Sequence, residues 1–210
     1  MIPKSKLITA PSESVVSLNE VKQFLRIDSN DDDTLLEVLI DSSTIRLEEE
    51  ICMKFISQEW EIYYDNFGNH NSSYNYSEPL FAQSSLTNHL SLPFGKVIQI
   101  DSISTFDNDD VEYIVPATAY QADTIGLNAK VSLRYGEIWP ATILRPSNGI
   151  KVSGLFGISN NAVNVPKHIK MAVMELVAAM YEYRGDEFPK IPATALMLIE
   201  PYRRFKIGCR

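Results

Sequence analysis

The sequence is poor in several residue types, and each shortage excludes a class of protein. Two cysteines, Cys52 and Cys209, are too few for a disulfide framework, and we expect both to be free thiols. The three histidines lack the spacing of metal ligands. No apolar run approaches the roughly 20 residues that cross a bilayer, and the N-terminus lacks the apolar stretch of a secretory signal. The sequence therefore predicts a protein made in the cytoplasm, with no membrane span and no metal site.

Motifs that carry enzyme chemistry are also missing. The sequence has no phosphate-binding Gly-x-x-x-x-Gly-Lys, no Gly-x-Ser-x-Gly and no His-Glu-x-x-His. Asp28-x-Asn30-x-Asp32 begins like a calcium loop, but Leu39 stands where a bidentate glutamate is needed. Capping of the following helix explains these acids better. The acids at 48–50 cover successive directions around a helix, which indicates a solvated surface. We expect no catalytic residue, no cofactor and no enzyme activity.

Basic residues are outnumbered, and this argues against a protein that wraps nucleic acid. The 19 lysines and arginines stand against 27 acidic residues, which gives a net charge of −8. The balance reverses in the last ten residues, where Arg203, Arg204, Lys206 and Arg210 stand without an acid. A basic end on an acidic body steers docking onto an acidic partner. The alternative for this end is a solvated, frayed terminus.

Helical periodicity marks both ends of the sequence. Ser17 and Glu20 form a capping box before a short helix, and apolar residues at helical spacing from Leu35 to Ile51 predict a long second helix. Pro166 opens a third helix with an apolar stripe. A last short helix is expected over 193–204, bent at its internal proline. Because neither end can bury its apolar stripe alone, the two ends should pack on each other.

Between these helices, the period of the pattern changes to that of strands. Trp60, Ile62 and Tyr64 alternate with polar residues. Further strand candidates lie at 89–92, 97–106, 112–115, 130–135 and 149–155. No helix separates them, so the sheet should be mostly antiparallel. Trp60 and Trp139 are expected as core anchors, with exposure at an interface as the alternative for Trp139.

These patterns predict an α+β fold with one domain inserted in another. Residues 1–57 and 166–210 would form a helical body with a C-terminal tail, and residues 58–165 an inserted, mostly antiparallel β module. Residues 66–88 look like an insertion within that module, rich in asparagine and serine. Its aromatic residues Tyr74, Tyr76 and Phe81 are candidates for partner contact, since tyrosine supplies rigid contact area. A surface loop without a partner is the alternative.

Several pieces of the sequence, taken in order, resemble the head–tail connector (adaptor) proteins of long-tailed phages, prophages and gene transfer agents. Residues 16–28 are similar to the family's opening, and residues 32–40 to the start of its long helix. The later pieces lie at 58–60, 65–67, 90–93, 100–103, 120, 136–140, 165–170, 195–196 and 201–203. One departure is that Cys52-Met-Lys54 stands where the family's long helix ends in threonine, glycine and arginine. We therefore expect this helix to lack its left-handed cap and to end differently.

The resemblance implies a structural protein of the virion neck, present in the host cytoplasm during assembly. It implies a homo-oligomeric ring, dodecameric in the family, between the portal and a stopper or tail-terminator protein. Double-stranded DNA would pass through the ring without sequence-specific binding, and an acidic body suits this because like charge removes the attraction to phosphates. The portal-docking candidates are Tyr202, Arg203, Arg204, Phe205 and Lys206. The alternative function, based on residues 66–88, is a β-sandwich-type surface or carbohydrate-binding module on a helical stalk.

Overall fold

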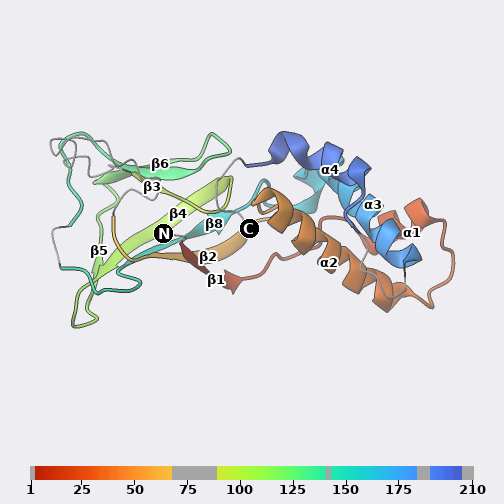
Figure 1. Ribbon diagram of the computed structural model, residues 1–210, viewed down its shortest axis with the longest axis horizontal. Helices are drawn as coiled ribbons and strands as arrows, with labels where there is room; N and C mark the ends of the chain where they lie inside the picture. Colours follow the sequence, from red (N-terminus) through yellow and green to blue (C-terminus); the bar gives the residue numbers. More distant parts are fainter. Residues whose placement is uncertain (1–2, 68–88, 141–142, 184–189, 205–210) are drawn as a thin grey trace. The chain divides into compact units, whose positions relative to one another are not determined.

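A computed structural model describes residues 3–67, 89–140, 143–183 and 190–204 (Figure 1). The chain divides into two compact units. The β unit comprises Met1–Ala10 and Gln58–Phe156, and the helical unit comprises Pro11–Ser57 and Gly157–Arg210. The chain passes from one unit to the other three times, because the first strand belongs to the β unit and precedes the first helix. The expected α+β class is confirmed.

The helical unit is built from elements at both ends of the chain. Its α-helices are α1 (Leu18–Leu25), α2 (Asp33–Ile51), α3 (Lys167–Glu182) and α4 (Ala193–Ile199). The 3₁₀ turns η2 (Ala162–Asn164) and η3 (Glu200–Tyr202) accompany them. The bend expected at Pro201 is the point where α4 gives way to η3. None of the helices in the described ranges is both long and apolar enough to cross a membrane.

The capping box forms as the sequence predicts. The Glu20 amide donates to Ser17 Oγ at 3.2 Å, and the Ser17 amide donates to Glu20 Oε2 at 2.7 Å. Two helix-end donors are thereby satisfied where no intrahelical acceptor exists. At the start of α2, Asp32 occupies the cap position but caps no backbone amide. Its carboxylate accepts instead from the Tyr181 hydroxyl of α3 at 2.6 Å, so this acid ties two helices together.

The end of α2 differs from expectation in two ways. Cys52 itself adopts the left-handed conformation, with φ of 55°, and its amide donates to the carbonyls of Glu48 and Glu49. The left-handed cap is therefore present without glycine, at the modest strain of a side chain in that region. Cys52 is also disulfide-bonded, so the expectation of a free thiol is wrong there. Spacing along the sequence cannot show which side chains a fold brings together.

The prediction that the acids at 48–50 form a solvated surface is wrong for Glu48, which is buried. It is 3% exposed, its Oε2 lies 2.9 Å from Lys54 Nζ, and its Oε1 accepts from the Phe55 amide at 2.8 Å. The left-handed turn at Cys52 brings residues 54 and 55 back over the last turn of α2. A charge in this position is held by an opposite charge and a backbone donor, as buried charges require.

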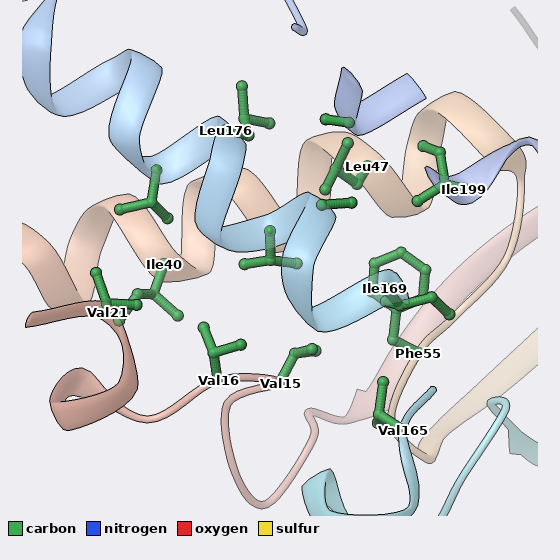
Figure 2. Packing of buried hydrophobic residues seen from close by; sticks show 14 of the residues in the cluster. Val15, Val16, Val21, Ile40, Leu47, Phe55, Val165, Ile169, Leu176 and Ile199 are labelled. Atoms are coloured by element: carbon green, nitrogen blue, oxygen red, sulfur yellow. The ribbon is translucent and has the colours of Figure 1, made fainter. Parts of the chain in front are cut away.

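One hydrophobic core holds the helical unit together, as predicted from the two amphipathic ends. Figure 2 shows its side chains directed into the space between α2 and α3. Val15, Val16, Val21, Leu36, Ile40, Leu47, Ile51, Met53, Phe55, Ile56, Val165, Ile169, Ala172, Val173, Leu176, Val177, Met180, Ala195 and Ile199 form the core. The apolar stripe of α3 supplies the central members, so this helix is covered by both N-terminal helices and by α4.

The described residues of the β unit form two antiparallel sheets. The first has the order β1-β2-β8-β4-β5, with β1 (Lys4–Thr9), β2 (Gln58–Tyr64), β8 (Ile150–Phe156), β4 (Val97–Phe106) and β5 (Glu112–Ile114). The second has the order β3-β7-β6, with β3 (His89–Ser91), β7 (Lys130–Leu133) and β6 (Tyr120–Asp123). All paired strands run antiparallel, as expected. Strands β1 and β6 are present in addition to the predicted ones.

Alternate residues of these strands bury one face of each sheet in a shared core. Ile62 and Tyr64 of β2 belong to the same cluster as Val131 of β7. Trp139 is 8% exposed and stacks on Phe67 with ring centroids 4.4 Å apart. The core position predicted for Trp139 is therefore confirmed, and the alternative of exposure is wrong. Trp60 packs against the edge of the same core.

Candidate assembly surfaces

The basic C-terminal segment lies against the end of α2 as far as the structure describes it. Arg203 Nη2 is 2.8 Å from Glu50 Oε1, and Arg203 Nε is 3.0 Å from Glu200 Oε2. The Arg204 amide donates to the Ile51 carbonyl at 3.2 Å. Three of the five docking candidates, at 202–204, are thus brought together on the helical unit. Phe205 and Lys206 lie outside the described residues.

These cations differ in their access to a partner. The Arg203 side chain is 30% exposed, so an acidic partner can reach it without displacing the segment. Arg204 is 4% exposed, and a partner could contact it only after the segment moved away from α2. Tyr202 is partly buried against the helical core. Among the described residues of this segment, Arg203 is the side chain that combines charge with exposure.

The three aromatic partner-contact candidates of the 66–88 stretch, Tyr74, Tyr76 and Phe81, lie outside the described residues. In their place the β unit exposes apolar side chains that sequence reasoning missed. Tyr135, Ile138 and Ile143 are fully or largely exposed on the connection from β7 to β8. The buried Trp139 anchors this connection, so Ile138 is held at the surface beside it. The sequence signal that could have indicated this exposed side chain is an apolar residue, Ile138, directly before the aromatic anchor Trp139.

Burial and ion pairs shape the electrostatics of the described residues. Burial, together with the Glu61 carboxylate, raises the pKa of Tyr63 to about 12, so its hydroxyl stays protonated. An open pocket of about 480 Å³ at the end of α1 includes Lys22 and Arg26 in its lining. Lys22 is already held by Asn30 and Asp33 at 2.6 and 2.7 Å. No cluster of three or more metal-ligating side chains occurs within the described ranges.

Comparison with known proteins finds a family similarity in the first part of the chain. The family model described as phage gp6-like head–tail connector protein matches residues 15–90. These residues contain α1, α2 and β2, the elements whose sequence carries the predicted resemblance most fully. No curated protein sequence matches the chain significantly.

Solved structures match nearly the whole chain. The neck of an empty gene transfer agent particle, computed with C6 symmetry, contains a chain 18% identical, with 97% of each chain covered and a TM-score of 0.74. The neck of the native particle, computed with C12 symmetry, gives 16% identity, 97% coverage of each chain and a TM-score of 0.74. A chain of the native gene transfer agent virion is 17% identical, with 98% of this chain and 99% of the other covered and a TM-score of 0.72. The predicted resemblance is confirmed: residues 15–90 match the connector family, and the chain has the fold of a neck protein.

Proposed function

We propose that this chain is a structural head–tail connector that forms a homo-oligomeric ring between the portal and the stopper or tail-terminator protein of a phage or gene transfer agent. The observation that carries the proposal is the likeness to neck chains over 97% of both chains, joined to the connector family match at 15–90. The matched necks were computed with C6 and C12 symmetry, which supports a ring. The proposed role is assembly and DNA passage, without catalysis.

The charge of the chain suits a channel for DNA. A net charge of −8 leaves no general attraction to phosphates, so a duplex can move past without being held. The basic C-terminal segment is the exception, and we assign it to the portal. Arg203 supports this assignment because it is charged and 30% exposed. Docking would replace its ion pairs to Glu50 and Glu200 with pairs to the portal, a modest exchange at an exposed site.

The experiment is to mix the purified chain with purified portal rings of the same particle and to weigh the products by mass photometry. We expect a portal carrying a ring of connector copies. Arg203→Glu should weaken this attachment, whereas Lys190→Glu, a reversal of another exposed cation of the helical unit, should not. Deletion of residues 201–210 should reduce attachment further. If the deletion variant attaches as well as the wild type, the docking role of the C-terminal segment is refuted. If the wild type does not attach to the portal, the connector role is refuted.

The alternative of a carbohydrate-binding module rests on residues 66–88, of which only Asn66 and Phe67 are described. A glycan array with the purified chain separates the two functions. A connector gives no selective signal, whereas a binding module recognises a defined set of glycans.

A further inference from the structure

The five-stranded sheet has two open edges, β1 and β5 (Figure 1). All residues of both strands are exposed. Val115 donates its amide to the Ile103 carbonyl on β4, so the alternate residues Glu112 and Ile114 point their backbone N–H and C=O groups away from the sheet. Among the described residues, no strand pairs with the outer side of β1 or of β5. Such edges readily accept another strand unless something prevents it.

The two edges carry opposite charge. Lys4 and Lys6 stand on β1, with side chains 60% and 68% exposed. Glu112 stands on β5, and the turn before it contains Asp109 and Asp110. Two β1 edges repel each other, and so do two β5 edges, whereas a β1 edge and a β5 edge attract. Edge lysines often serve only to prevent pairing, but here the same molecule supplies a complementary acidic edge.

The charges also lie on the same face of the sheet. Residues that pair across neighbouring strands share a face, and such pairs lead from Lys4 through Tyr63, Lys151 and Ser104 to Ile114 on β5. Glu112 lies two residues from Ile114 on the same strand, so its side chain is on the same face as that of Lys4. This face already alternates in sign, because Lys6 lies 3.9 Å from Glu61 and Lys151 lies 2.7 Å from Glu112. A neighbouring β1 strand beside β5 would continue the alternation with Lys4 or Lys6. Register shifts of two residues keep each side chain on its face.

The other face offers an apolar match. Leu7 pairs with Trp60, and Tyr113 pairs with Thr105, which places Leu7 and Tyr113 on the face opposite the lysines. They are 43% and 44% exposed, each at its own edge of the sheet. Pairing of the two edges would bring both side chains together and remove them from water. Charge on one face and apolar area on the other thus favour the same pairing.

We propose that a second copy of this chain docks on each edge, so that β5 of one copy pairs with β1 of the next and the sheets join around the ring. Four antiparallel steps separate β1 from β5, so the two strands run in the same direction and the new pair is parallel. Two different surfaces meet in this contact, and such head-to-tail contacts close into a ring when the rotation between neighbours divides a full turn. The inference rests on the proposed function for the existence of the ring, and adds the surface that joins its members.

Charge reversal tests this pairing. One variant, Lys4→Glu with Lys6→Glu, makes both edges acidic, and a second, Asp109→Lys with Glu112→Lys, makes both edges basic. Each alone should give at least about tenfold fewer connector rings on portal particles by mass photometry, because opposite charges across paired strands become like charges at every contact. An equimolar mixture of the two should recover rings, since each acidic edge then meets a basic one. Lys130→Glu, on an exposed lysine of β7, is the control and should assemble normally.

The outcomes separate the two proposals. Rings from either variant alone at the wild-type level, or a mixture of folded variants that stays unassembled, overturn the edge pairing and leave the connector role intact. Absence of rings from the wild type overturns the connector role itself. Glu112→Lys places a second cation beside Lys151, so circular dichroism must confirm folding. If that variant is unfolded, Asp109→Lys alone replaces it, because it keeps the pair between Lys151 and Glu112.

Discussion

Removal of the Glu48 carboxylate should destabilise the helical unit more than any other change to an acid of α2. Glu48 is 3% exposed and Lys54 12% exposed, with 2.9 Å between their charged atoms. Glu48→Ala removes the partner of Lys54 and also the acceptor of the Phe55 amide, whose hydrogen bond is 2.8 Å long. Both losses act at the point where the chain leaves α2.

The expected cost follows from these contacts. Breaking a buried pair by deleting one member costs about 3 to 5 kcal/mol, and the lower end applies because Lys54 keeps some access to water. Glu48→Gln retains an acceptor for the Phe55 amide, so its cost should fall to about 2 kcal/mol. For a domain of this size, about 3 kcal/mol corresponds to a fall in Tm of roughly 6 to 12 °C. Glu48→Gln combined with Lys54→Met should recover part of the loss, since no charge remains unpaired.

The assay is urea unfolding followed by circular dichroism at 222 nm, where α-helices dominate the signal, with the exposed neighbour Glu49→Ala as control. The control should stay within about 0.5 kcal/mol of the wild type. Equal losses for Glu48→Ala and Glu49→Ala would refute the reasoning. A double variant that loses the sum of the single losses would show that residues 48 and 54 do not interact.

Three further predictions concern single contacts. Hydrogen bonding from the Ser17 backbone lowers the pKa of Glu20. The stabilisation of α1 by Glu20 is therefore complete above the ordinary carboxyl pKa of 4.5 and is lost as the pH falls through the lowered pKa. Ser17→Ala should lower the free energy of unfolding by about 1 kcal/mol and weaken this acid sensitivity, as measured by urea unfolding across the acid range. Tyr181→Phe should cost about 1 kcal/mol through loss of the bond to Asp32, and no change in the urea midpoint would contradict that contact. Gly154→Ala should cost about 1 to 3 kcal/mol or more, because a Cβ there would lie 2.5 Å from a β4 carbonyl oxygen, and a wild-type Tm would contradict the close strand approach.

Local patterns predicted the elements whose causes are local. The capping box of Ser17 needs only residues three positions apart, and β4 was predicted at 97–106, where a polar turn follows the strand pattern. Strand β1 was missed because its sequence, Lys-Ser-Lys-Leu-Ile-Thr, shows no alternation. It buries neither face, and only pairing with the distant β2 makes it a strand. Strand β6 contains no β-branched residue and was missed for a similar reason.

The site residues were predictable only where the sequence itself carries the signal. The charge contrast of the C-terminal segment was visible, and Arg203 is indeed a charged and partly exposed side chain. The burial of Glu48 was not visible, because its cause is a left-handed turn at Cys52 that sequence rules assign to glycine. The complementary edges were invisible as well, since β1 and β5 become the two borders of one sheet only through long-range pairing. Long-range pairing sets the limit of what patterns can predict.

The place of β1 in the sheet has a consequence for synthesis. Lys4 pairs with Tyr63, so the first strand leaves the ribosome before its partner exists. Translation at about 5 to 20 residues per second leaves it waiting for several seconds while α1 and α2 emerge. Its leucine–isoleucine pair stays uncovered during that interval, and its two lysines then act as a safeguard against premature aggregation. A bulky fusion placed ahead of this strand would interfere at the moment when the β unit closes.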